Sequence, residues 1–206
     1  MREEIHFWRV PGWEEVEVIR GRAVIRECPK HWHEEIHICL IEAGGGTLFY
    51  SNNSFETPPE SLFIVQPGEM HGNYTRNPNG CSYRTLNIAP EIYKRFLSEI
   101  TGSEKYSFWL RTPVIFDADI IQLFKRAHRT FEFSSSNLER DSLLLELFRK
   151  IIFRYSENHI SQKTKNERYA IRKVCEYLKQ NLAENILLKD LSGIANLSPF
   201  HFSRTF

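Results

Sequence analysis

Residues 31–46 read HWHEEIHICLIEAGGG, and residues 67–71 read PGEMH. Both stretches place histidines beside an apolar segment that is bounded by glycine or proline. Side chains of an extended chain alternate between two faces, so His31, His33 and His37 are expected on one face. Two imidazoles on one face can reach a single ion, and a turn at Pro67-Gly68 can deliver His71 from a neighbouring strand. The two stretches therefore predict a β-structure that gathers four histidines.

The rest of the first ninety residues also has the pattern of short strands. Glycine, proline and asparagine punctuate the apolar segments, and Arg20-Gly21-Arg22 is a predicted turn between the first two. Strands at this spacing predict a small closed antiparallel barrel or jelly roll. The expected strands span residues 15–19, 23–27, 36–42, 47–50, 61–66 and 83–89.

From residue 90 onward the apolar period changes to that of helices. Pro90 starts a predicted helix that ends near Ile100, and Asp117 caps one that runs to about Phe133. A further helix has an apolar stripe wide enough to cover the barrel and to offer a face to a second copy, which predicts a homodimer. The alternative is that the whole stripe packs inside one chain. The stripe residues proposed for dimerisation are Leu143, Leu144, Leu147, Phe148 and Ile151.

The C-terminal residues form a second predicted unit after a polar linker at 156–166. Residues 163–206 hold eight Lys/Arg and four Asp/Glu, whereas residues 1–162 hold 19 and 22. This basic balance indicates either a nucleic-acid partner or an ordinary solvated surface. Ser198 is a good N-cap and Pro199 a good first residue for a last helix, which follows a turn at Asn196-Leu197.

That last helix is predicted to present one face to a DNA major groove. Phe202 and Phe206 are four residues apart and are expected to face the preceding helix. Arg204 is the expected base reader, through guanine O6 and N7. The residues proposed for DNA contact are Ser198, Phe200, His201, Ser203 and Arg204.

The histidine spacing resembles that of the cupins. The pattern from His31 to Gly44 follows the first cupin motif, with His37 in place of the usual glutamate, and the pattern from Pro67 to His71 is similar to the second motif with its proline displaced by one. Ile25 and Thr75 depart from the pattern, where a glycine and an asparagine are usual. The resemblance implies one divalent ion, and four imidazoles without a carboxylate suit zinc or nickel. The implied ligands are His31, His33, His37 and His71.

The alternative is that the histidines bind a small effector, such as a sugar or an organic acid, without a metal. The residues proposed to line this effector pocket are His31, His33, His37, His71, Trp32, Arg22, Tyr50 and Arg84. Arg84 is included because an inward arginine would pair with a carboxylate. Its other interpretation is a strand arginine that faces solvent.

Residues 187–206 strongly resemble the first helix-turn-helix of the AraC family, through the pattern LSPFHFSRTF at 197–206. The N-terminal motifs resemble that family's cupin-like sensor, so the resemblance spans nearly the whole chain. It implies a mixed α and β protein: an antiparallel β-barrel with a helical hairpin over residues 1–160, then a partial all-α helix-turn-helix domain over 161–206. The family domain is longer, so we expect a truncated domain that binds DNA poorly by itself.

The resemblance implies an effector-responsive transcription regulator that binds DNA and is not an enzyme. The alternatives are a metal-dependent cupin oxygenase or isomerase, and a carbohydrate-binding module without regulation. No apolar run approaches the roughly 20 residues that span a membrane, and the N-terminus lacks the apolar stretch of a signal peptide. The four cysteines are scattered, which is typical of reduced thiols, so we expect a cytoplasmic protein.

Overall fold

The computed structural model describes residues 2–25, 27–75, 77–102, 108–134, 136–157, 162–182, 184, 186–199 and 202, with the backbone alone for 162–168. The chain divides into two compact units, Met1–Glu157 and Asn158–Phe206. The expected boundary after residue 160 lies close to this division.

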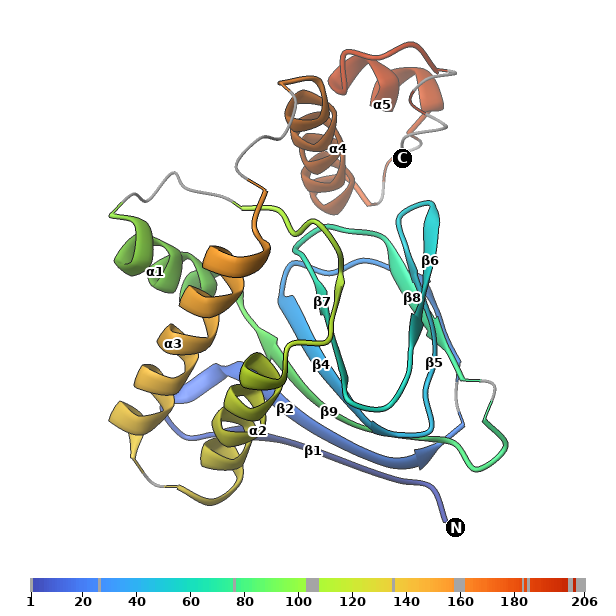
Figure 1. Cartoon of the computed structure of the whole chain (residues 1–206). Helices are drawn as coiled ribbons and strands as arrows, with labels where there is room; N and C mark the ends of the chain where they lie inside the picture. The colour runs from blue at the N-terminus through green and yellow to red at the C-terminus, as the bar shows by residue number, and fades with distance from the viewer. Residues whose placement is uncertain are drawn as a thin grey trace. The chain divides into compact units, whose positions relative to one another are not determined.

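Two antiparallel sheets form the β-rich part of the first unit (Figure 1). The larger sheet has the strand order β1-β2-β9-β4-β7-β10 and the smaller one β3-β8-β5-β6. The strands are β1 (Glu4–Val10), β2 (Trp13–Val24), β3 (Cys28–His31), β4 (Ile36–Ala43), β5 (Gly46–Tyr50), β6 (Asn53–Thr57), β7 (Ser61–Val65), β8 (His71–Tyr74), β9 (Cys81–Ile88) and β10 (Val114–Ile115).

The larger sheet has one face against helices and one face toward the smaller sheet. On β4, Ile36, Ile38 and Leu40 belong to the apolar core that includes the helices. His37, Cys39 and Ile41 alternate with them and therefore face the other way. Cys39 and Ile41 join a second apolar cluster, which includes Leu48 of the smaller sheet. The strand thus separates a packed helical layer from the barrel interior.

The predicted turn at Arg20-Gly21-Arg22 is wrong, because β2 runs through it as one strand. Gly21 is needed for close approach: a Cβ there would lie 2.4 Å from the Tyr83 ring of β9. The pairing of β2 with β9 shifts only beyond Gly21, and Ala23 there has a φ of +51°. The turn residues therefore mark a bulge, which bends the strand without ending it.

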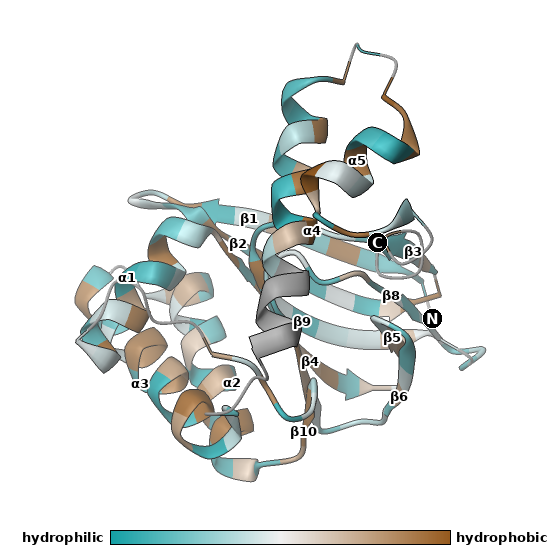
Figure 2. Ribbon diagram, turned by 90° about the horizontal axis from the view of Figure 1, so that it is seen from above, coloured by the Kyte–Doolittle hydropathy of each residue, from teal (hydrophilic) through white to brown (hydrophobic). Residues whose placement is uncertain are grey.

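Three helices cover the larger sheet: α1 (Pro90–Thr101), α2 (Ala118–Phe133) and α3 (Asn137–Tyr155). The predicted helix start at Pro90 and the predicted cap at Asp117 are confirmed, and the Asp117 side chain accepts hydrogen bonds from the backbone N–H groups of Asp119 and Ile120. Figure 2 shows hydrophobic and hydrophilic residues side by side on these helices, as expected for one-sided packing.

The α3 stripe is buried inside this unit, so its proposed role in dimerisation is corrected. The five side chains are at most 6% exposed and pack in the core with α1, α2 and the sheet, so they leave no free face for a second copy. The structure therefore agrees with the alternative, in which the whole stripe packs inside one chain. The residues concerned are Leu143, Leu144, Leu147, Phe148 and Ile151.

Arg84 also lies on the helical side of the sheet, so its proposed place in the effector pocket is wrong. Its Nε donates to Glu42 at 2.6 Å, and its Nη1 lies 3.2 Å from Glu132 of α2. The same Nη1 donates to Nδ1 of His128 at 3.3 Å, and His128 Nε2 donates to the Ile19 carbonyl at 3.1 Å. The expected carboxylate partner exists, but it belongs to the protein and ties α2 to the sheet.

The second unit contains α4 (Gln162–Gln180) and α5 (Leu188–Ile194). Asn196 adopts a left-handed φ of +54°, which agrees with the predicted turn. A helical hydrogen bond from the Phe202 N–H to the Ser198 carbonyl follows at 2.8 Å. Phe202 is buried, in a cluster with Ala170, Val174 and Ala195.

Of the residues proposed for DNA contact, Ser198 is exposed. The other four, Phe200, His201, Ser203 and Arg204, lie outside the described residues, as does Phe206. Among the helices of the described residues, none combines the length and the apolar character needed to cross a membrane.

We predict that Leu147→Ala destabilises the fold. The Leu147 side chain is fully buried, so its truncation leaves a cavity and should cost about 2–5 kcal/mol of unfolding free energy. Urea denaturation measures this loss. Leu138→Ala is the matched control on the same helix, because Leu138 is 77% exposed, and it should change stability by less than about 0.5 kcal/mol. Equal stability of the two variants would contradict the packing described above.

We also predict that His128 makes stability fall in acid. Burial lowers the pKa of His128 from 6.5 to about 4. The unfolded state therefore binds more protons than the folded state between these values, and stability is lost as pH falls through this window. The loss from His128 alone should be about 2 kcal/mol at pH 5.

Urea denaturation at pH 7.5 and at pH 5 measures this dependence in the wild type and in His128→Gln. The variant should lose about 2 kcal/mol less than the wild type between the two pH values, since glutamine does not titrate. His6→Gln, at an exposed position, is the control and should keep the wild-type dependence. An unchanged dependence in His128→Gln would show that His128 does not cause it.

Candidate functional site

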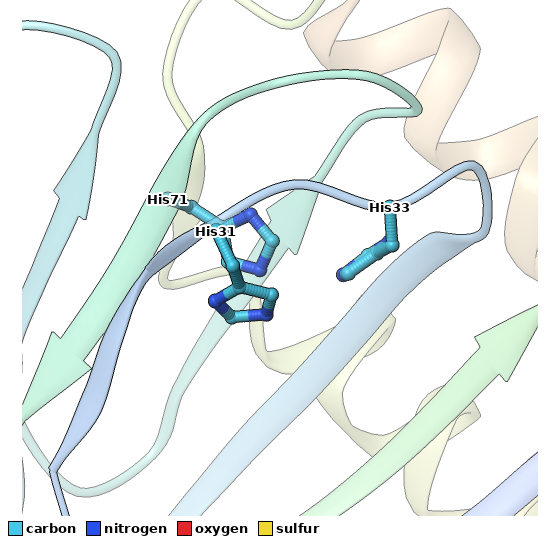
Figure 3. A group of neighbouring side chains, drawn as sticks. All are labelled: His31, His33 and His71. Atoms are coloured by element: carbon cyan, nitrogen blue, oxygen red, sulfur yellow. The ribbon is translucent and has the colours of Figure 1, made fainter. Parts of the chain in front are cut away.

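His31 and His71 face each other across two strands of the smaller sheet. His31 ends β3, His71 begins β8, and the two residues are paired in register. Their ring centroids are 4.3 Å apart, and Figure 3 shows the rings side by side. The register places Tyr50 of β5 opposite His71 on its other side. Tyr50, predicted as a pocket residue, packs against the barrel's inner cluster.

His33 and His37 approach the same place from the other direction. His33 lies in the connection from β3 to β4, and a hydrogen bond of 2.8 Å from the Gly68 N–H to its carbonyl joins it to the Pro67-Gly68 turn. The His33 ring centroid is 4.7 Å from that of His71. His37 lies on β4, with its ring 5.9 Å from His33 and stacked on Phe63 at 5.5 Å.

The four histidines therefore converge, but not as one face of one strand. That expectation is wrong, because His31 belongs to the smaller sheet and His37 to the larger one, with residues 32–35 outside any strand. The side chains meet because the two sheets face each other. The ligand atoms of three of them lie within 4.8 Å of one another, which is close enough to share one ion. These three are His31, His33 and His71 (Figure 3).

Each imidazole has its Nδ1 held by a hydrogen-bond acceptor. For His31, His33 and His71 the acceptors are the backbone carbonyls of residues 29, 35 and 69, at 2.8, 3.0 and 3.0 Å. For His37 the acceptor is the side-chain oxygen of Asn87, at 2.7 Å. A carbonyl oxygen only accepts, so Nδ1 carries the proton and Nε2 keeps a lone pair. The site thus contains four imidazoles whose Nε2 atoms are electron-pair donors.

Burial favours the uncharged form of three of these rings. Burial first, and then the nearby imidazoles, lower the pKa of His37 to about 3 and that of His71 to about 4. The pKa of His33 is also lowered, first by burial. Neutral imidazole is the form that binds a metal ion, whereas imidazolium repels one.

The remaining residues that were predicted to line the pocket do not belong to the histidine cluster. Trp32 is partly buried in the connection between His31 and His33, and Arg22 is exposed on β2. Arg84 lies outside the barrel interior, as described above. Of the eight proposed residues, the structure brings together His31, His33, His37 and His71, with Tyr50 beside His71.

The sequence interpretation missed two kinds of neighbour. Cys28 lies with its Sγ 3.6 Å from Nδ1 of His31, on the same short strand. Asn87 of β9 accepts a hydrogen bond from His37, and its Nδ2 donates to an oxygen of Glu17 on β2 at 3.2 Å. Alternation within each strand could show which face these residues share, but only the pairing of β2, β9 and β4 shows that they are neighbours.

Two facing antiparallel sheets thus gather four histidines in the interior of the barrel. Residues 15–148 match the model of the AraC-like ligand binding domain. The chain belongs to this family.

Similarity to known regulators extends beyond that domain. The uncharacterized HTH-type transcriptional regulator YbfI of Bacillus subtilis (strain 168) is 26% identical over 191 residues, which cover 93% of this chain and 69% of YbfI. The crystal structure of the AraC-like transcriptional activator CuxR has a TM-score of 0.54 at 10% identity and covers 99% of this chain and 73% of its own. ToxT from Vibrio cholerae O395 has a TM-score of 0.57 at 13% identity, over 92% of this chain and 72% of its own. The two structures show a shared fold.

Proposed function

We propose that this chain is the sensing part of a DNA-binding transcription regulator of the AraC type, which responds to a small molecule bound in its barrel. The observation that carries this proposal is the match of residues 15–148 to an AraC-like ligand binding domain, joined to a second, helical unit. YbfI, which is similar to this chain over 191 residues, is named as an HTH-type transcriptional regulator. The location that such a regulator requires is the cytoplasm.

The second unit supports the DNA-binding half of the proposal. Helix α5, the left-handed turn at Asn196 and the helical hydrogen bond between Ser198 and Phe202 follow the order of a helix-turn-helix. Buried Phe202 fits the role of holding the second helix against its support. We therefore interpret residues 161–206 as the first part of a DNA-binding domain, with Arg204 as its base reader.

The histidine cluster supports a divalent transition metal in the sensor. Four imidazoles with Nε2 lone pairs, and no carboxylate among them, suit zinc or nickel better than calcium or magnesium. His31, His33 and His71 would hold the ion, and His37 is the candidate fourth ligand. A bound ion would supply positive charge on which an oxygen of an effector can be held.

The same nitrogen atoms also select among effectors in the absence of a metal. Nε2 atoms without protons accept hydrogen bonds and do not donate them. They match the hydroxyl groups of a sugar, which donate, better than the carboxylate of an organic acid, which only accepts. Effector binding would act on DNA by shifting the population between arrangements of two regulators, to the extent that it binds one arrangement more tightly.

A homodimer remains part of the proposal, but through other residues than the α3 stripe. Two large apolar side chains, Phe133 of α2 and Phe153 of α3, are 73% and 77% exposed and are available for a second copy. The enzyme alternative, a metal-dependent cupin oxygenase or isomerase, is favoured only by the histidine cluster. It does not account for the second unit or for the similarity to a regulator.

We predict that the wild type binds one equivalent of Zn²⁺, which raises its melting temperature. Isothermal titration and thermal denaturation measure both effects. His71→Ala should abolish high-affinity binding, because His71 contacts both other rings of the cluster. His6→Ala is the exposed control and should bind like the wild type. Equal zinc affinity in His71→Ala and the wild type would exclude this site.

We predict that the chain binds DNA weakly and through Arg204. Selection of genomic fragments on the immobilised protein should enrich a sequence motif at low salt and lose it at about 200 mM salt, because few phosphates are contacted. Arg204→Ala should remove the sequence preference, while Lys163→Ala, a charge-matched control in the first turn of α4, should keep it. If no motif is enriched at any salt concentration, the regulator proposal fails for this chain.

A further inference from the structure

Four polar side chains cross the inner face of the larger sheet as a row. Arg9 of β1, Glu17 of β2, Asn87 of β9 and His37 of β4 lie on four neighbouring strands. The register pairs Arg9 with Glu17, Glu17 with Asn87, and Asn87 with His37. Directly paired residues point to the same face of a sheet, so each side chain can reach the next.

An ion pair and two hydrogen bonds connect the four side chains, and Glu17 accepts from both of its neighbours. Arg9 forms an ion pair with Oε1 of Glu17, which leaves Oε2 as an acceptor. Asn87 Nδ2 donates to this Oε2 at 3.2 Å, and Asn87 Oδ1 accepts from Nδ1 of His37 at 2.7 Å. The far end of the row is the imidazole whose centroid lies 5.9 Å from His33 and 6.1 Å from His71.

The glutamate determines which way the asparagine amide is turned. A carboxylate accepts hydrogen bonds only, so the amide NH₂ must face Glu17 and the amide oxygen must face His37. The reverse orientation would place two acceptor oxygens against each other. An oxygen at His37 accepts only from a protonated Nδ1, and the neutral ring then has its lone pair on Nε2.

We propose that Glu17 and Asn87 are positioning residues that hold His37 as the Nδ1–H tautomer, and so present its Nε2 as a fourth electron-pair donor to the His31–His33–His71 cluster. This inference rests on the proposed ligand site in the barrel. In this arrangement, Arg9 occupies the other carboxylate oxygen of Glu17.

His37 differs from the other three histidines in the kind of group that holds its Nδ1. Their Nδ1 atoms are held by backbone carbonyls two residues away in the chain, which no side-chain substitution removes. The Nδ1 of His37 is held by a side chain 50 residues away. The tautomer of His37 is therefore the one that a single substitution outside the cluster can change.

The experiment measures the histidine tautomers of the metal-free protein by long-range ¹H–¹⁵N NMR at pH 7.5, and then titrates the same samples with Zn²⁺. Asn87→Leu should release His37 from the Nδ1–H form and lower zinc affinity about 10- to 100-fold, the usual effect of losing a residue that orients a ligand. Glu17→Gln should give a mixture of tautomers, since the glutamine amide can donate or accept.

Thr85→Val is the matched control, on the same face of β9 and two residues from Asn87. Thr85 is paired with Cys39 and not with His37, so this variant should keep the tautomer and change zinc affinity less than about twofold. Circular dichroism confirms that each variant is folded. If His37 keeps the Nδ1–H form in both Asn87→Leu and Glu17→Gln, the proposed role of Glu17 and Asn87 as positioning residues is overturned.

The two readouts separate this inference from the proposed function. If the wild type binds no zinc, the proposed metal site is wrong. The tautomers of the metal-free variants still show whether Glu17 and Asn87 position His37. If zinc binds with equal affinity to the wild type and to Asn87→Leu although the tautomer changes, His37 is not a fourth donor and the proposal is overturned.

Discussion

The structure depends on the alternation of side chains along β4. Ile36, Ile38 and Leu40 bury one face of this strand against the helices, which anchors it in the larger core. The residues between them, His37 and Cys39, are thereby directed into the barrel. A shift of one residue would exchange the two sets, placing an imidazole in the helical core and isoleucines at the site. Packing on one face thus specifies the chemistry on the other.

The site is built by two different kinds of constraint. Backbone carbonyls of nearby residues hold three imidazoles, so the local chain conformation sets their tautomers. The fourth, His37, is oriented through side chains of other strands. Burial adds a further condition by lowering the pKa of His33, His37 and His71, which favours their neutral form. The result is a set of lone pairs that suits a cation or hydroxyl groups and disfavours an anion.

The helical layer shows why charge and apolar character alone do not reveal a surface. The α3 stripe was wide enough for a second copy, yet α1, α2 and the sheet together cover it. Arg84 was expected to meet a carboxylate of an effector, yet Glu42 and Glu132 satisfy it between β9 and α2. In both cases the partner came from a part of the chain remote in sequence. Local sequence patterns indicate the kind of partner that a side chain requires. The packing of elements distant in the sequence determines which residue becomes that partner.

The sequence by itself determined the classes of element and the residues of the cluster. The His31–His37 and Pro67–His71 motifs indicated four histidines in a barrel, and Asp117 and Pro90 marked helix starts, because spacing and capping are local properties. Only the tertiary structure decided that His31 and His37 come from facing sheets, that β2 passes through Gly21 with a bulge, and that Asn87 stands beside His37 and Glu17 beside Asn87. Strand pairing joins residues far apart in the chain, and no local pattern encodes which strands become neighbours.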